Sequence, residues 1–248
     1  MSAEIPVADL ARGETLIVLD QLLSTAWFYY LDLIGTVAFA VSGAIKSYKL
    51  DYDYFGTVLL VALPAVGGGT VRDIVVGGDR HPPFIFNDPV YLYIVFGVVV
   101  GAIVWSRFYQ PDHRVNKPLN TVLNVCDTVG VAAFTVIGAK VAIISGLDWF
   151  WAPILAALTC SGGSVISNAV TGHESSVLKG EFYEEVAAAG GLFLVLALML
   201  AQNAEDPATL CVVAVVACLV GTFGGRWWVI QRGIQSPTLQ SGSGGRAT

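Results

Sequence analysis

Asp-Leu-Ile-Gly-Thr-Val-Ala-Phe-Ala-Val-Ser-Gly at residues 32–43 is followed 95 positions later by Asp-Thr-Val-Gly-Val-Ala-Ala-Phe-Thr-Val-Ile-Gly at residues 127–138. The likeness continues without a gap, so that residues 32–77 align with 127–172 and 16 of these 46 positions are identical. Most of the glycines are among the identical positions. The chain is therefore built from two copies of one unit, and each copy carries a glycine cluster inside an apolar stretch.

The composition indicates that the solvent of these copies is lipid. Of the 248 residues, 55% are hydrophobic and 13% are charged, about half the charged fraction of soluble domains. A helix needs about 20 mostly apolar residues to span a bilayer. Seven stretches meet this requirement, near residues 27–46, 54–76, 90–107, 122–144, 149–171, 184–202 and 208–230. The sequence predicts an all-α membrane protein with seven transmembrane helices, and a single large soluble core is the disfavoured alternative.

The repeat divides the chain into five expected parts. The expected parts are an N-terminal segment (1–26), a first three-span repeat (27–118), a second three-span repeat (119–202), a seventh span (203–235) and a flexible tail (236–248). Because each copy has an odd number of spans, the second copy enters the membrane from the opposite side. The two repeats are therefore predicted to be inverted, as in many transport proteins. A duplication retained for packing alone is the alternative.

The basic residues predict the orientation. If the N-terminus is outside, nine Lys and Arg residues fall in inner segments and three in outer segments. Because positive charge favours the inner side of a membrane, we expect the N-terminus outside and the C-terminus in the cytoplasm. The first residues are acidic, whereas a signal peptide begins with basic residues.

The second span contains a signal for interrupted helix. Pro64 has no N–H to donate to the carbonyl of Leu60, and its ring crowds the preceding turn. Three successive glycines, Gly67, Gly68 and Gly69, follow it, and each costs about 1 kcal/mol of helix propensity. Interrupted helix at membrane depth survives only inside protein or beside a water-filled cavity.

The fifth span carries a related cluster, Gly162-Gly163-Ser164. Paired breaks in the two copies would bring half-helices together near the membrane midplane, where freed carbonyls could replace part of the hydration shell of a cation. The alternative is that the small residues allow helices to pack closely.

Several ionisable residues fall within or beside the spans. Arg72 and Asp73 follow the first glycine cluster, and the aligned positions of the second copy are Ser167 and Asn168. A charge at the bilayer centre costs roughly 2.5–3.5 kcal/mol on insertion scales, so such residues are usually functional or paired. Arg72 could pair with Asp73 or with Asp127, and both Arg72 and Asp73 could instead lie at the outer interface.

Three further charges leave two interpretations open. Lys140 lies inside the fourth span and either extends to the headgroups or faces a pore. Asp32 and Asp127 occupy aligned positions near the predicted starts of the first and fourth spans. Both carboxylates either stabilise the first helical turn or lie at the two mouths of a cation pathway.

The remaining motifs exclude several classes of function. No catalytic motif and no metal-ligand spacing are present, and the four cysteines fit a packing role. The net charge of −6 and the lack of a basic face disfavour nucleic-acid binding. The expected partner is membrane lipid, including bound lipid, and no cofactor is expected.

Three segments resemble the prokaryotic branch of the trimeric intracellular cation (TRIC) channel family, whose domain is also called a glycine transporter. They are Asp32 to Gly43, the stretch Gly67-Gly-Gly-Thr-Val-Arg-Asp73 followed by Gly77 and Pro82-Pro83, and Asp127 to Lys140. The resemblance covers roughly residues 27–230. It differs from the family pattern in the second copy, where Ser164, Ser167 and Asn168 stand in place of a third glycine and an Arg-Asp pair.

The resemblance implies a seven-span homotrimer in the inner membrane, with one pore for K⁺ and Na⁺ in each protomer. It places the pore and gate beside the second and fifth spans. The predicted pore residues are Leu60, Pro64, Gly67, Gly68, Gly69, Arg72, Asp73, Lys140, Gly162, Gly163, Ser164, Ser167 and Asn168, with Asp32 and Asp127 at the mouths. A secondary transporter of a small solute such as glycine and a membrane scaffold are the alternative functions.

Overall fold

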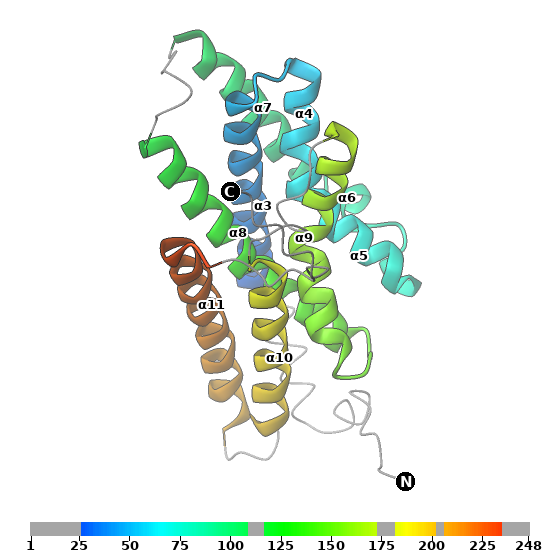
Figure 1. Cartoon of the computed structure of the whole chain (residues 1–248). Coiled ribbons are helices and arrows are strands. Elements are labelled where there is room, and N and C mark those ends of the chain that lie inside the picture. The colour runs from blue at the N-terminus through cyan, green and yellow to red at the C-terminus, as the bar shows by residue number, and fades with distance from the viewer. Residues whose placement is uncertain (1–25, 109–116, 173–181, 202–205, 235–248) are drawn as a thin grey trace, which may run out of the picture.

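The computed structural model describes residues 26–108, 117–172, 182–201 and 206–234. Its helices are α3 (Ala26–Lys49), α4 (Tyr54–Ala62), the π-helix η1 (Leu63–Gly67), α5 (Gly68–Val76), the 3₁₀ turn η2 (Gly78–Arg80), α6 (Phe84–Asn87), α7 (Val90–Phe108), α8 (Lys117–Ile144), α9 (Trp151–Thr171), α10 (Glu184–Ala201) and α11 (Pro207–Arg232) (Figure 1). The described residues contain seven helices long and apolar enough to cross a membrane, so the predicted fold class is confirmed. Residues 1–25 and the predicted tail lie outside the described part of the chain.

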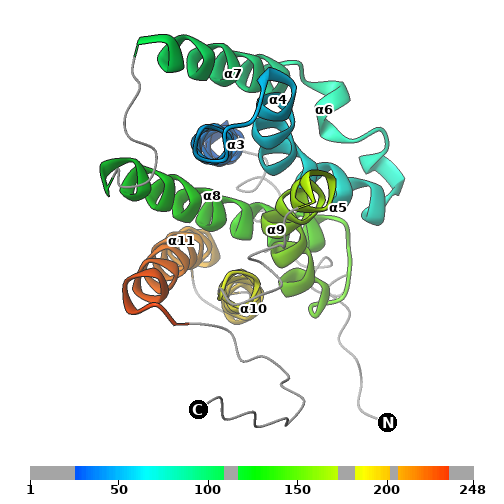
Figure 2. The same cartoon turned by 45° about the horizontal axis from the view of Figure 1, so that its top comes forward.

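Helices α3 and α8 pack against each other at the centre of the bundle (Figure 2). Their contact is reciprocal under the 95-residue repeat. A Cβ on Gly35 would lie 2.7 Å from the ring of Phe134, and a Cβ on Gly130 would lie 2.7 Å from the ring of Phe39. The two rings meet edge to face with centroids 5.0 Å apart. This exchange of equivalent contacts is what a two-fold axis between inverted repeats produces.

A second reciprocal contact joins each central helix to the next span of its own repeat. Gly43 of α3 lies against the carbonyl oxygen of Leu60, and Gly138 of α8 lies against the carbonyl oxygen of Leu155. A Cβ at either glycine would collide with that backbone. The absence of a side chain therefore sets the distance between the first and second helices of both repeats.

The second and fifth spans cross at the two glycine clusters. A Cβ on Gly67 would lie 3.2 Å from the Cα of Gly163, and a Cβ on Gly162 would lie 3.4 Å from the Cα of Gly68. Gly163 also faces the Leu63 carbonyl, and Gly68 faces that of Thr159. This is the close packing through small residues that was the alternative to broken helix.

The interruption predicted in the second span is present in a milder form. Leu63–Gly67 is π-helical, and the three glycines continue as helix. Pro64 cannot donate to the Leu60 carbonyl, so one extra residue is accommodated in this turn.

The break predicted at Gly162-Gly163-Ser164 is wrong, because α9 continues from Trp151 to Thr171 without interruption. Thr159 occupies the position aligned with Pro64 and keeps its backbone N–H. Its hydroxyl also donates to the Leu155 carbonyl at 2.6 Å. The second copy therefore lacks the residue that forces the π turn, and its glycines alone do not interrupt the helix.

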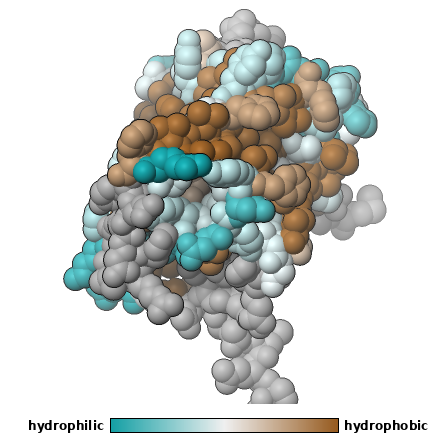
Figure 3. Space-filling model, turned by 90° about the horizontal axis from the view of Figure 1, so that it is seen from above, coloured by the Kyte–Doolittle hydropathy of each residue, from teal (hydrophilic) through white to brown (hydrophobic). Residues whose placement is uncertain are grey.

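The outer helices present apolar side chains to the surroundings. On α7 an exposed stripe at four-residue spacing comprises Leu92, Phe96, Val100, Val104 and Phe108. Figure 3 shows a broad hydrophobic surface on the face of the molecule seen from above, bordered by hydrophilic side chains. Such a surface suits contact with lipid chains, and the molecule is an integral membrane protein.

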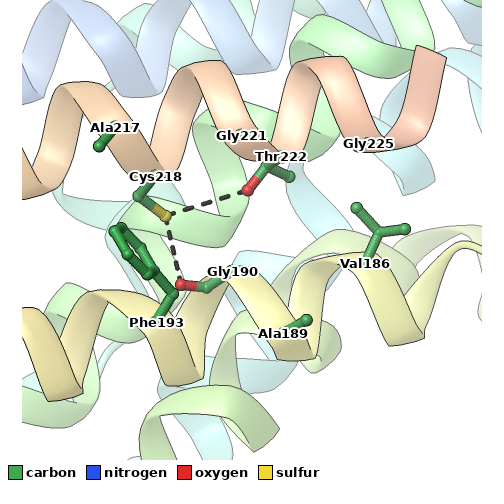
Figure 4. A pocket seen from close by; sticks show the side chains of 9 residues that line it. All are labelled: Val186, Ala189, Gly190, Phe193, Ala217, Cys218, Gly221, Thr222 and Gly225. Atoms are coloured by element: carbon green, nitrogen blue, oxygen red, sulfur yellow. Dashed lines mark hydrogen bonds between the residues drawn. The ribbon is translucent and has the colours of Figure 1, made fainter. Parts of the chain in front are cut away.

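Helix α11 lies outside the repeats and packs on α8 and α10. Between α10 and α11 runs a groove of about 360 Å³ lined by small and apolar residues (Figure 4). The Cys218 thiol donates to the Gly190 carbonyl at 3.3 Å across this contact. The groove has no charged lining residue and is therefore distinct from the polar clusters described next.

Candidate ion pathway

Two clusters of charged side chains lie at opposite ends of α3. The first, the Asp32 cluster, contains Asp32, Arg72, Asp73, Tyr91 and Lys140. The second, the Asp127 cluster, contains Asp127, Ser42, Lys46, Tyr183 and Arg226. Ten residues, about 15 Å of helix, separate Asp32 from Ser42 along α3. The two glycine clusters that cross come one from each repeat.

Arg72 and Asp73 form a buried ion pair at the end of α5. Their side chains are 4% and 2% exposed, and the Nη2–Oδ1 distance is 2.7 Å. Arg72 Nε donates to the same oxygen at 2.9 Å, and the backbone N–H of Phe84 donates to Oδ2 at 3.1 Å. Both carboxylate oxygens therefore have donors, which offsets part of the cost of burial.

Asp32 faces this pair from α3. Its Oδ2 accepts a hydrogen bond of 2.7 Å from the Tyr91 hydroxyl of α7. Arg72, Asp73 and Lys140 are close enough to interact electrostatically with its carboxyl group. The Lys140 ammonium lies 4.5 Å from the centroid of the Phe28 ring. Lys140 thus points toward the first part of α3, and both predicted interpretations of this residue stay open.

Asp127 holds the aligned position in the second repeat, but its partners differ. Its Oδ1 lies 3.4 Å from Lys46 Nζ and accepts a 3.4 Å hydrogen bond from Ser42. Its Oδ2 lies 3.5 Å from Nη2 of Arg226 on α11. Arg72 therefore pairs with Asp73 and leaves Asp127 to other cations.

Several buried oxygens lie on α9 and at the start of α10. The hydroxyl groups of Ser167 and Tyr183 and one carboxylate oxygen of Glu184 have no hydrogen-bond partner within the described residues. Burial raises the pKa of Tyr183 well above its usual value, so this phenol stays neutral. Glu184 interacts with Ser161 of α9 and with Arg226. Unfilled oxygens of this kind are suited to water or to a partly dehydrated cation.

The predicted capping role of Asp32 and Asp127 is wrong. Helix α3 begins at Ala26 and α8 begins at Lys117, so both carboxylates lie well inside their helices. The fourth span starts earlier than its apolar pattern indicated because Lys117 to Asn124 forms a polar first part of α8. Carboxylates inside a span require partners, and each has them.

Only part of the other predicted pore residues meet at the crossing. Gly67 and Gly68 lie against Gly163 and Gly162 there, and Pro64 is in the π turn that precedes them. Leu60 instead lies against Gly43 of α3, and Gly69 lies against the ring of Phe84. Ser164 is half-buried on α9, and the Asn168 carbonyl accepts the N–H of Gly172 at the end of that helix. The sequence did not single out Ser42, Lys46, Tyr91, Tyr183 or Arg226 as site residues. The only signal for them in the sequence was a polar residue within or beside an apolar stretch, because their partners come from other helices.

The arrangement can attract cations at two places and restrict them between. Carboxylates draw cations toward each end, while the adjacent arginines and lysines limit that attraction. Between the clusters the helices meet glycine against glycine. This geometry places two carboxylate sites within one protomer.

Comparison with known proteins supports the repeat and the family. The family model described as "Glycine transporter" matches twice, at residues 29–107 and 124–199, and the two matches begin 95 positions apart. A UPF0126 membrane protein of Vibrio cholerae is 31% identical over 74% of this chain and 73% of its own length. The UPF0126 inner membrane protein YadS of Escherichia coli is 34% identical over 66% of this chain and 75% of its own.

Solved structures extend the likeness to the whole bundle. A TRIC trimeric intracellular cation channel orthologue from Rhodobacter sphaeroides has a TM-score of 0.70 at 27% identity and covers 85% of this chain and 100% of its own. A second TRIC cation channel has a TM-score of 0.69 at 27% identity, covering 86% and 97%. With its double family match and this shared architecture, the chain belongs to the Glycine transporter (UPF0126) family of membrane proteins, whose fold is that of the prokaryotic TRIC cation channels.

Proposed function

We propose that the protein is a channel for monovalent cations, K⁺ and Na⁺, with one pathway in each protomer. The observation that carries this proposal is the pair of carboxylate clusters, related by the repeat, on either side of the glycine crossing. Asp32 and Asp127 are inside their helices and partnered by side chains from other helices. Packing alone does not require aligned carboxylates at both ends of one bundle. The fold shared with TRIC cation channels supports the same function.

The pathway runs from the Asp32 cluster past the crossing to the Asp127 cluster. A cation is drawn first by one carboxylate and then by the other, while carbonyl oxygens near the glycines replace part of its hydration. The gate is the crossing itself, where Leu63, Gly67 and Gly68 meet Gly162 and Gly163. Since η1 has a π-helical hydrogen-bond pattern, a return to α-helix would rotate the residues beyond it and change the width of the crossing.

Recordings from purified protein in planar bilayers test this proposal. Under a KCl gradient we expect unitary currents that reverse near the K⁺ equilibrium potential, and similar currents with Na⁺. Asp32→Asn and Asp127→Asn should each reduce cation-over-anion selectivity. Glu185→Gln, an exposed acidic residue on α10, is the matched control and should leave selectivity unchanged. Absence of unitary currents in the wild type would contradict a channel.

Transport of a small solute is the second candidate, favoured by the description of the family itself as a glycine transporter. A zwitterion such as glycine could place its carboxylate beside Arg72 or Arg226 and its ammonium beside Asp32 or Asp127. Saturable, current-free uptake of labelled glycine into proteoliposomes, with a rise in Tm on adding glycine, would support this function. If glycine changes neither uptake nor Tm, transport of glycine is excluded.

We also propose a homotrimer in a prokaryotic inner membrane, with the N-terminus outside and the C-terminus in the cytoplasm. The trimer is supported by the description of the Rhodobacter sphaeroides relative as trimeric, and the membrane by that of the Escherichia coli relative. Native mass spectrometry of the detergent-solubilised protein should give a mass of three chains with bound lipid. A monomer at concentrations that retain activity would contradict the trimer.

A further inference from the structure

Arg226 contacts Asp127 from a helix that lies outside the repeat. Its side chain is 3% exposed, and its Nη2 is 3.5 Å from Oδ2 of Asp127. Nη1 donates to the Phe182 carbonyl at 3.1 Å. The guanidinium group also lies 4.7 Å from the centroid of the Tyr183 ring. These three contacts hold one buried cation in a defined place on the second carboxylate.

The repeat shows what is missing at this carboxylate. Asp32 aligns with Asp127, and Arg72 aligns with Ser167. In the first copy Arg72 forms a buried ion pair with Asp73, whereas the aligned Ser167 and Asn168 carry no charge in the second. The Ser167 residue is 1% exposed, and its hydroxyl has no hydrogen-bond partner in the part of the chain that the structure describes. The second repeat therefore has a buried carboxylate without an arginine of its own.

The packing of α11 explains how Arg226 reaches this place. A Cβ on Gly190 of α10 would lie 2.5 Å from Thr222 Oγ1, so the two helices are in close contact there (Figure 4). Arg226 is one turn after Thr222 and therefore on the same face of α11. Both residues are 3% exposed. The close approach of α10 and α11 thus directs the guanidinium into the bundle.

We propose that Arg226 supplies to Asp127 a buried counter-charge in place of the arginine that the second copy lacks at Ser167, the position aligned with Arg72. Helix α11 is then part of the ion pathway, and Arg226 sets how strongly Asp127 attracts cations. This inference rests on the proposed channel function for its effect on current. The ion pair itself can be tested without any current.

A double-mutant cycle tests the pair. Arg226→Gln, Asp127→Asn and the double variant are compared with the wild type by thermal unfolding in detergent. Because breaking one side of a buried pair leaves an uncompensated charge, Arg226→Gln should lower Tm by at least about 5 °C. In the Asp127→Asn background the same change should cost much less. Arg232→Gln, on the same helix but beside Trp228, is the matched control and should leave Tm nearly unchanged.

Bilayer recordings test the effect on the pathway. Among the described residues Arg226→Gln leaves Lys46 as the one cation paired with Asp127, so unitary K⁺ conductance in dilute salt should rise by about twofold or more. At high salt the difference from wild type should shrink because the charge is screened. Adding Ser167→Arg to Arg226→Gln should restore both Tm and conductance toward wild type.

The outcomes separate the inference from the channel proposal. Additive losses of Tm in the cycle overturn the ion pair, whatever the currents are. A coupled cycle with unchanged conductance overturns the role of Arg226 in the pathway and leaves it a structural residue. Failure of Ser167→Arg to restore either quantity overturns the equivalence with Arg72. Absence of current in the wild type overturns the channel, while the cycle still decides the pair.

Discussion

Single glycines fix how closely the helices of this protein approach one another. Gly43 and Gly138 are the clearest examples, because each lies against a backbone carbonyl that cannot move without displacing its helix. Their identity in the two copies follows from a contact that the repeat reproduces. By contrast, a Cβ added to Gly97 or Gly101 on α7 would have nothing within 4 Å of it, so their lack of a side chain serves no close contact inside the protomer.

Alanine substitutions separate these two kinds of glycine. We expect Gly43→Ala and Gly138→Ala each to destabilise the protein by about 1–3 kcal/mol, since the added methyl group overpacks the contact. Gly97→Ala should instead be neutral or stabilise α7 by up to about 1 kcal/mol through helix propensity. Unfolding in detergent followed by tryptophan fluorescence measures both. Equal effects at Gly43 and Gly97 would show that the close contact is absent.

The Arg72–Asp73 pair is the most buried charge pair among the described residues. Asp73→Asn removes the charge but keeps the shape, which leaves Arg72 buried without its counter-ion. We expect a loss of about 3–5 kcal/mol in the free energy of unfolding. Asp79→Asn, in the exposed turn η2, is the matched control and should change stability by less than about 0.5 kcal/mol. A similar loss for both variants would contradict the pair.

The sequence predicted the ion pair of the first repeat better than the ion pairs of the second repeat. Arg72 and Asp73 are neighbours in the chain, so their pairing was among the expected possibilities. Asp127 pairs with Lys46 and Arg226, which are 81 and 99 positions away. No local pattern contains such distances, and the arginine comes from a span outside the repeat. Contacts of this kind require the packing of three helices to be known.

At the scale of elements, one proline accounts for the difference between the second and fifth spans. Both carry two aligned glycines, and the sequence therefore predicted a break in both. The π turn forms only where Pro64 withholds an N–H, whereas Thr159 keeps α9 α-helical. Glycine lowers helix propensity but leaves every backbone hydrogen bond possible. The prediction failed at α9 because propensity was weighed above hydrogen bonding.

Substitutions at Thr159 test this explanation. Thr159→Pro should introduce an interruption into α9 and destabilise the protein by about 3 kcal/mol or more. Thr159→Val keeps the shape and the backbone N–H and loses only the hydroxyl bond to Leu155, so it should cost no more than about 1 kcal/mol. Thermal unfolding of both variants gives the comparison. If valine is as harmful as proline, the hydroxyl and not the backbone holds α9 straight.

At the scale of the whole molecule, composition and repeat were sufficient to predict seven spans and two inverted units. Lipid as solvent requires long apolar helices whose backbone groups are satisfied internally, and this leaves a strong mark on the sequence. The reciprocal contacts of Gly35 with Phe134 and Gly130 with Phe39 then follow from the aligned positions. The polar clusters leave a weaker mark, because a few charges among many apolar residues do not reveal their partners.

Reporter fusions test the orientation predicted from the basic residues. Green fluorescent protein fused after residue 234 should fluoresce in a bacterial host, because it folds in the cytoplasm. Alkaline phosphatase at the same point should be inactive, and the enzyme inserted near Asp79 should be active because that turn is expected outside. The opposite pattern for both reporters would show that the N-terminus is inside.

Because of the π turn in η1, the two repeats differ in how readily their backbone can change conformation. One repeat can change its backbone hydrogen-bond pattern at Leu63–Gly67, and the aligned turn of α9 has no such freedom. In the proposed channel, with its gate at this crossing, only one of the two repeats can change its backbone there. With identical salt on both sides of a bilayer, the current should then rectify, with opposite voltages driving unequal flow.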